Sequence, residues 1–251
     1  MAVETIGVLH PGEMGAAVAA VLRGQGRRVV WASGGRSAET RGRAEAAGLD
    51  DVGTPAEVAS SGVIFSICPP HAALEVARSL GPFDGLYVDA NAVSPATAQE
   101  VAEVVRAAGG RFVDGGIVGS PTREAGSTRL YLSGAEADTV AELFAGSVLD
   151  ARVVPNASAV KMAYAAWTKG TAAMLLAIRE LARREGVEEA LLEEWALSQP
   201  ALPDRHARAE RSAEAKGWRW VGEMEEIAAS FEADGLPGGF HRAAAEVYRR
   251  R

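Results

Sequence analysis

The chain has 251 residues, of which 48% are hydrophobic and 24% charged, and its formal net charge is −7. This composition is close to that of globular proteins and excludes a mainly disordered or fibrous chain. The acidic balance argues against nucleic acid or an anionic membrane as the main partner, and no apolar run approaches the roughly 20 residues of a membrane helix. Cys68 is the single cysteine, so no disulfide and no metal site are predicted, and a cytoplasmic location fits.

The first half of the chain alternates between short apolar runs and helix-like segments. We predict strands at 5–9, 28–32, 62–67, 86–89, 111–118, 129–133 and 152–154, and helices at 16–23, 37–47, 71–80, 95–108 and 135–145. Such alternation is typical of parallel βαβ units with helices on both faces of the sheet.

The second half, after Pro155, is helix-like throughout. Residues 157–184 contain no proline and one glycine, which predicts a helix roughly 40 Å long. Further helices are predicted at 188–197, 204–216, 218–232 and 240–250. The fold class is therefore α/β: a Rossmann-type doubly wound sheet over 1–155, and a small all-α domain over 156–251 that begins with the long helix.

The turn from Gly7 to Gly15 reads G-V-L-H-P-G-E-M-G, between a predicted strand and a predicted helix. Glycines at this spacing let the chain turn tightly and let a pyrophosphate approach the amides of the helix N-terminus. His10 replaces the usual central glycine, one residue further out. The candidate cofactor-binding residues are Gly7, His10, Pro11, Gly12, Glu13 and Met14. A plain strand-to-helix turn is the alternative interpretation.

The end of the second strand indicates which dinucleotide would bind. An NAD site usually has an acidic residue there for the ribose hydroxyls, but no acid occurs between Trp31 and Glu39. Ser33, Arg36 and Ser37 could instead surround a 2′-phosphate, for which an arginine and hydroxyl donors are suited. This favours NADP over NAD, with a solvated surface arginine as the alternative.

Five stretches together resemble the β-hydroxyacid dehydrogenase family and its 6-phosphogluconate dehydrogenase relatives. They are the glycine turn at 7–15, I-C-P-P at 67–70, D-A-N-A-V-S-P at 89–95, V-D-G-G-I-V-G-S-P at 113–121 with G-S-T-R-L-Y-L-S-G at 126–134, and K-M-A-Y-A at 161–165. The resemblance is strongest to a short branch with a reduced C-terminal domain. It implies a nicotinamide-dependent dehydrogenase whose active site lies between the domains, beside the long helix.

The resemblance also implies roles for single residues. Cys68 and Pro69 correspond to a loop that covers the cofactor, and Asn91 to a residue that contacts nicotinamide and substrate. Asn91 could instead cap a loop. The residues that correspond to the loop holding a substrate carboxylate are Gly119, Ser120 and Thr122. Val118 stands where relatives often have serine, so the anion contact could be shifted.

Lys161 corresponds to the catalytic lysine of the family. Hydride transfer from a secondary alcohol leaves a hydroxyl proton to remove, and reduction leaves an alkoxide to protonate. A lysine can do both if burial lowers its pKa from about 10.4 towards neutrality, and a charged lysine can polarise a carbonyl. An exposed helix lysine is the alternative, but the chain has only three lysines, Lys161, Lys169 and Lys216.

The chain departs from the family pattern near this lysine. Ala165 stands where relatives have asparagine, and Tyr164 could supply a hydroxyl instead. Residues 225–227 read E-E-I in place of the Lys-Asp-Leu of many relatives. His241 could project into the substrate cleft or simply begin a helix, and Trp167 could line the pocket.

The sequence therefore predicts an NADP-dependent oxidoreductase that transfers a hydride between nicotinamide and a small β-hydroxy acid or related carbonyl. The substrate is expected to carry a carboxylate. An imine reductase and a non-catalytic dinucleotide-binding regulator remain alternatives, and Lys161 speaks against the first because imine reductases generally replace it. A homodimer is expected because the small helical domain would expose apolar surface as a monomer.

Overall fold

The computed structural model describes residues 5–121 and 124–250, which form two compact units, Met1–Lys161 and Met162–Arg251. The first unit contains β1 (Thr5–Val8), α1 (Glu13–Gly24), β2 (Arg28–Trp31), α2 (Ala38–Ala46), β3 (Asp50–Asp51), α3 (Pro55–Val58), β4 (Val63–Ser66), the short 3-10 helix η1 (Pro70–Ala72), α4 (Ala73–Arg78), β5 (Leu86–Asp89), α5 (Pro95–Ala107), β6 (Arg111–Gly119), β7 (Thr128–Ser133), α6 (Ala137–Glu142) and β8 (Asp150–Val153). The helices α7 (Ala157–Arg184), α8 (Glu188–Ser198), α9 (Leu202–Ala233) and α10 (Gly239–Arg249) follow. No helix of the described residues is long and apolar enough to cross a membrane.

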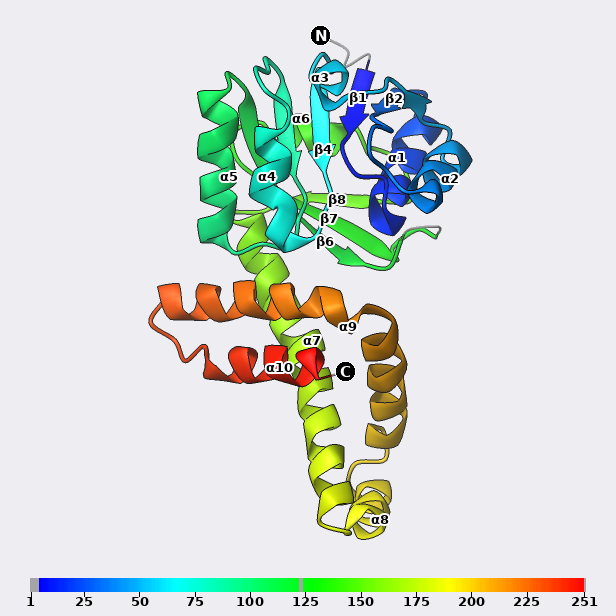
Figure 1. The fold of residues 1–251 in the computed structure, drawn as a ribbon, viewed down its shortest axis with the longest axis vertical. Coiled ribbons are helices and arrows are strands. Elements are labelled where there is room, and N and C mark those ends of the chain that lie inside the picture. Colours follow the sequence, from blue (N-terminus) through cyan, green and yellow to red (C-terminus); the bar gives the residue numbers. More distant parts are fainter. Residues whose placement is uncertain (1–4, 122–123, 251) are drawn as a thin grey trace. The chain divides into compact units, whose positions relative to one another are not determined.

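The sheet of the first unit has the strand order β3-β2-β1-β4-β5-β6-β7-β8. The first six strands in this order, from β3 through β2, β1, β4 and β5 to β6, are parallel. The chain passes from β1 to β2 on one side and later to β4 on the other side of β1. One apolar cluster packs α1, α2 and α6 on one face, and a second packs α3, α4 and α5 on the other (Figure 1). The predicted doubly wound fold is thus confirmed, and its switch point lies between β1 and β4.

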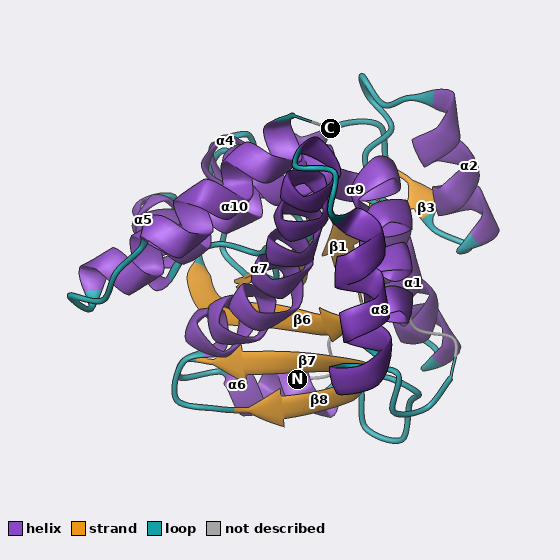
Figure 2. Ribbon diagram, turned by 90° about the horizontal axis from the view of Figure 1, so that it is seen from below, coloured by secondary structure: helices purple, strands orange, loops and turns teal. Residues whose placement is uncertain are grey.

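Two strands, β7 and β8, depart from the parallel pattern. β7 runs antiparallel to β6, and β8 is parallel to β7, as the reversed arrow of β7 in Figure 2 shows. Only residues 120–127 join β6 to β7, and so short a connection cannot make the crossover that a parallel pair needs. The sheet is therefore mixed at this edge.

The strand β3 is absent from the sequence prediction. It consists of two aspartates, Asp50 and Asp51, with no apolar alternation to reveal it. It pairs with β2 so that Asp51 lies opposite Trp31. This pairing carries an acidic side chain to the end of β2.

The long helix is confirmed as α7, whose first five residues belong to the first unit. In the second unit, α9 is one continuous helix, whereas two were predicted on either side of Gly217. A glycine within a helix costs only about 1 kcal/mol relative to alanine, and Gly217 is buried near Tyr248. Figure 1 shows that α9 bends along its course. The division at residue 155 into a cofactor domain and a substrate domain stays a prediction.

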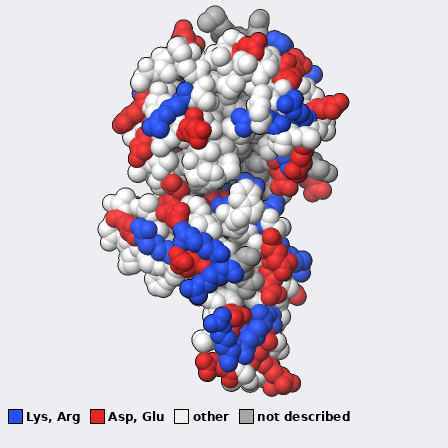
Figure 3. Space-filling model, viewed as in Figure 1, with Lys and Arg blue, Asp and Glu red and all other residues white. Residues whose placement is uncertain are grey.

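Polar contacts join three helices of the second unit. Lys169 on α7 and Glu223 on α9 form an ion pair with 2.6 Å between Nζ and Oε2, and their side chains are only 15% and 10% exposed. The Tyr248 hydroxyl on α10 donates to the Lys169 carbonyl at 2.6 Å. Charged side chains of both signs are interspersed on the face of each unit seen in Figure 3.

Candidate active site

The glycine turn after β1 is shaped by close backbone packing. A Cβ on Gly15 would lie 2.1 Å from the His10 carbonyl oxygen, and one on Gly7 would lie 2.5 Å from Val58. Gly12 precedes α1 without any side-chain cap, and a Cβ there would meet nothing within 4 Å. The space beside Gly12 at the N-terminus of a twelve-residue helix is therefore open, and a helix N-terminus is suited to a phosphate.

His10 links this turn to the one after β2. Its Nε2 lies 2.6 Å from Arg36 Nη1, which is always a donor. Burial, and then the charge of Arg36, lowers the pKa of His10 to about 4. The imidazole is therefore neutral near pH 7 and carries its proton on Nδ1, which is buried without a hydrogen-bond partner among the described residues.

The loop after β2 is built by its own polar groups. Arg41 donates to the carbonyls of Ser33, at 2.9 Å, and Arg36, at 3.3 Å. Ser37 begins α2, and its hydroxyl accepts from the Thr40 amide. Across residues 5–121 and 124–250, neither Arg36 nor Arg41 forms an ion pair. Two guanidinium groups at the end of β2 thus keep charge that no carboxylate neutralises by direct contact.

Asp51 belongs to this region, although sequence reasoning missed it. Its Oδ1 accepts from the Ser33 amide at 3.1 Å and the Gly53 amide at 2.9 Å. Hydrogen bonding by Ser33, and then by Gly53, lowers the pKa of Asp51, so this exposed carboxylate is ionised at neutral pH. An acid therefore stands beside the end of β2 after all, contributed by the next strand. Asp51 comes beside β2 only through strand pairing, so no pattern along the chain indicates it.

Asn91 joins the loops that follow β4 and β5. Its Oδ1 accepts from the Cys68 amide at 2.6 Å, and its Nδ2 donates to the Ser66 hydroxyl at 3.1 Å. Burial raises the pKa of the Cys68 thiol to about 12, so Cys68 stays a neutral thiol. Pro69 follows directly. The structure therefore gives Asn91 a role in fixing the loop, and its contact with a ligand stays a prediction.

The start of α7 packs tightly against β6. A Cβ on Gly116 would lie 2.9 Å from both the Ala157 carbonyl oxygen and Lys161 Cβ. Asp114 accepts from the Ser158 amide at 2.8 Å and from its hydroxyl at 2.5 Å. The Asn156 side chain accepts from the Ala159 amide and so caps the helix. These contacts fix the first turn of α7 on the sheet.

Lys161 lies one turn further along α7, and its Nζ donates to the Ile117 carbonyl at 2.7 Å. Ile117 is two residues before Gly119, which has a φ of +124°. A Cβ on Gly119 would lie 2.2 Å from the Ser127 carbonyl oxygen, so only glycine fits there. The Ser120 carbonyl accepts from the Thr128 hydroxyl. Thr122 lies outside the described residues. Lys161 and the stretch before Gly119 are thus brought together at the end of β6.

The other predicted substrate residues lie in the helical unit. Tyr164 is 46% exposed on α7. His241 is buried, with its ring 4.4 Å from that of Phe231, and burial lowers its pKa. Its Nδ1 would lie 3.7 Å from a Cβ on Gly170, so it packs between helices. The roles of both residues towards substrate stay predictions.

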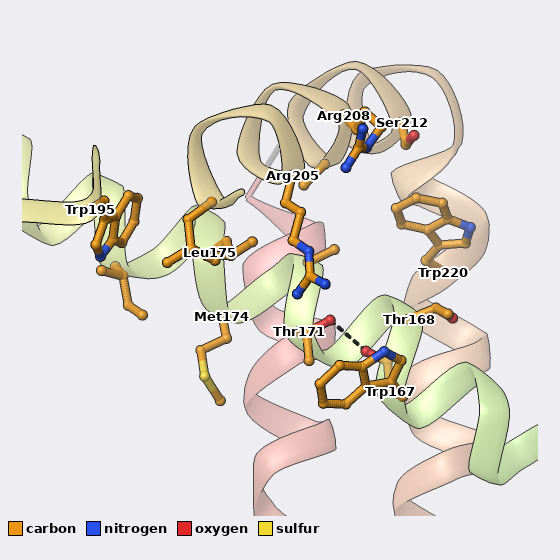
Figure 4. A pocket seen from close by; sticks show the side chains of 14 residues that line it. Trp167, Thr168, Thr171, Met174, Leu175, Trp195, Arg205, Arg208, Ser212 and Trp220 are labelled. Atoms are coloured by element: carbon orange, nitrogen blue, oxygen red, sulfur yellow. Dashed lines mark hydrogen bonds between the residues drawn. The ribbon is translucent and has the colours of Figure 1, made fainter. Parts of the chain in front are cut away.

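A pocket of about 570 Å³ lies among α7, α8 and α9. Figure 4 shows Trp167, Arg205 and Trp195 around it, with the Thr171 hydroxyl donating to the Trp167 carbonyl. Trp167 is 63% exposed, so it lines this pocket rather than the core. No group of three or more potential metal ligands occurs in the part of the chain that the structure describes.

Comparison with known proteins identifies the family. Residues 5–151 match the model of the NAD-binding domain of 6-phosphogluconate dehydrogenase. The chain belongs to this family. Residues 182–251 match a domain of unknown function, DUF1932. A dinucleotide-binding domain of the NAD(P) type is therefore present, followed by a helical domain that carries no assigned activity.

Three proteins are similar to this chain in sequence or fold. The conserved protein MTH1747, described as being of unknown function and structurally similar to 3-hydroxyacid dehydrogenases, is 28% identical over 98% of this chain and 96% of that chain, with a TM-score of 0.70. The 3-hydroxyisobutyrate dehydrogenase of Salmonella typhimurium is 17% identical over 98% and 93%, with a TM-score of 0.73, and shows the fold alone. An uncharacterized 28.5 kDa protein of Methanothermus fervidus is 32% identical over 140 residues, about half the length of each chain.

The close approach at Gly116 predicts the effect of one added methyl group. Gly116→Ala should force α7 away from β6 and lower the free energy of unfolding by about 1–3 kcal/mol, a usual cost of overpacking. Gly24→Ala is the matched control, because Gly24 lies in the helix α1 and a Cβ there would meet nothing within 4 Å. Urea unfolding of both variants would measure the difference. Equal stabilities would show that α7 is not held as described.

Proposed function

We propose that the protein is an NADP-dependent oxidoreductase in which Lys161 acts as the general acid or base on a small β-hydroxy acid or related carbonyl. The observation that carries this proposal is the hydrogen bond from Lys161 Nζ to the Ile117 carbonyl, which holds the ammonium at the end of β6. An ammonium has three donors, so this bond is compatible with a second one to a substrate oxygen. When bound, the nicotinamide would supply or accept the hydride.

The residues of the first unit fit a dinucleotide. The N-terminus of α1, with open space beside Gly12 and no side-chain cap, suits the pyrophosphate. Arg36, with no carboxylate partner among the described residues, together with Ser33 and Ser37, would take a 2′-phosphate. Asp51 supports the competing assignment, because a carboxylate near the end of β2 can accept from ribose hydroxyls of NAD.

Two variants distinguish these assignments. The wild-type protein should bind NADPH at least about tenfold more tightly than NADH, and Arg36→Met should remove most of that preference, because a charge-assisted hydrogen bond contributes roughly 1.5–3 kcal/mol. Asp51→Asn should leave NADPH binding equal or tighter, because a repelling charge is lost. Calorimetric titration of both dinucleotides measures each constant. Tighter NADH binding that Asp51→Asn abolishes would establish NAD instead.

The substrate side of the proposal extends to residues beyond Lys161. Asn91, Gly119, Ser120 and Thr122 in the first unit, and Tyr164 and His241 in the second, are the candidates for binding a carboxylate-bearing substrate. Tyr164 is exposed and could replace the asparagine that relatives have at Ala165. An imine reductase and a non-catalytic dinucleotide-binding regulator are the alternative functions.

Removal of the lysine separates catalysis from cofactor binding. Lys161→Met should lower turnover of a responsive β-hydroxy acid about 10²- to 10⁴-fold, the usual contribution of a general acid or base, while the Kd for NADPH stays within about twofold. A panel of β-hydroxy acids and cyclic imines with NADPH or NADP as the readout identifies that substrate. Lys216→Met serves as the control. Unchanged turnover in Lys161→Met would refute the proposed role, and turnover of imines alone would favour the alternative enzyme.

The helical unit supports the proposal that the protein is a homodimer. Trp167, Met174, Ile178 and Leu181 are exposed on α7 at intervals of seven, four and three residues, so they share one face. Apolar grooves on both sides of this face include Trp167 and Met174. An exposed apolar face of this kind is typical of an interface between subunits.

Sedimentation at micromolar concentration tests the assembly. The wild-type protein should sediment as a dimer, and Met174→Asp should shift it to monomer, because a charge would be buried without a partner. Leu197→Asp on α8, a residue 84% exposed, should leave the dimer intact. A wild-type monomer would overturn the dimer proposal without affecting the proposed enzyme activity.

A further inference from the structure

His10 and Arg36 form a contact that the family pattern does not anticipate. His10 follows β1 and Arg36 follows β2, so the contact joins the turn that would face the pyrophosphate of a bound dinucleotide to the turn that would face its adenosine ribose. No described residue other than glycine has a positive φ, so the imidazole is accommodated without backbone strain. The position at which a glycine is usual thus carries a side chain with a defined partner.

The backbone of Arg36 is fixed by other groups. Its amide donates to the Ser33 carbonyl at 3.1 Å, and its carbonyl accepts from Arg41 at 3.3 Å. The only hydrogen bond found for its guanidinium among the described residues is the one to His10. The direction in which the guanidinium points therefore depends on the imidazole.

The identity of the partner also decides the charge that Arg36 presents. Arg28, at the start of β2, pairs with the Asp50 carboxylate at 2.9 Å, which neutralises it. His10 instead accepts as a neutral imidazole, so the full positive charge of Arg36 remains for an anionic ligand. A carboxylate in place of His10 would hold the guanidinium equally well but would cancel its attraction for phosphate.

We propose that His10 is a positioning residue for cofactor specificity: its neutral imidazole orients Arg36 towards the 2′-phosphate of NADP without neutralising it. The inference rests on the proposed NADP-dependent function and adds a second determinant to it. His10 acts through Arg36, and its effect falls on the 2′-phosphate rather than on the parts that NADP and NAD share.

Four variants test the inference: His10→Phe, His10→Gln, Arg36→Met and the double variant with His10→Phe and Arg36→Met. His10→Phe keeps a ring of similar size but removes the acceptor, and should weaken NADPH binding about tenfold while NADH binding stays within about twofold. His10→Gln restores an acceptor and should bind NADPH within about threefold of wild type. In the Arg36→Met background, His10→Phe should cause no further loss of NADPH affinity, because the residue it acts through is gone. Calorimetric titration of both dinucleotides gives all the constants.

The outcomes distinguish a failure of the positioning role from a failure of the proposed function. Equal weakening of NADPH and NADH by His10→Phe, no weakening of NADPH, or a full additional loss in the Arg36→Met background would each overturn the positioning role. Wild-type protein that binds NADPH tightly but is unaffected by His10→Phe would leave the proposed function standing. Wild-type protein that binds neither dinucleotide would overturn the proposed function, and this inference with it.

Discussion

The contact between Gly116 on β6 and the first turn of α7 is the constraint on which the candidate site depends. No side chain fits between the strand and the helix, because a Cβ would lie 2.9 Å from two atoms of α7. The glycine brings the helix close enough for Asp114 to accept from the Ser158 amide and hydroxyl. Lys161 then lies one turn along, with its ammonium against the Ile117 carbonyl. The absence of a Cβ at Gly116 thus determines the position of Lys161, the proposed acid or base.

The loops after β1, β2 and β3 are held together by polar contacts rather than by close packing. Ser33, Asp51 and Gly53 form one set of hydrogen bonds, and His10 and Arg36 form another. A neutral imidazole holds the Arg36 guanidinium, whereas two backbone amides hold the Asp51 carboxylate. The end of β2 therefore presents a positive and a negative charge, and the preference between the two dinucleotides depends on which charge meets the ribose.

Local patterns were sufficient to predict the doubly wound sheet, the glycine turn and the long helix, because apolar periodicity and glycine spacing are read along the chain. The rest depended on distance in space. Asp51 arrives through a two-residue strand with no periodicity, and β7 is antiparallel because of a short connection. Gly217 was interpreted as a helix end, whereas packing against Tyr248 is compatible with a continuous α9.

The same limit applies to the residues named from the family resemblance. Asn91 was selected for contact with a ligand, yet its side chain also bonds to Cys68 and Ser66, a use that no motif states. Both uses are compatible, because a side-chain amide has two N–H donors and Ser66 takes one. The same two hydrogen bonds that fix the loop after β4 therefore also fix the orientation of the Asn91 amide. In both regions the partners are uncharged: the Asn91 side chain bonds to a backbone amide and a hydroxyl, and the Arg36 guanidinium bonds to an imidazole.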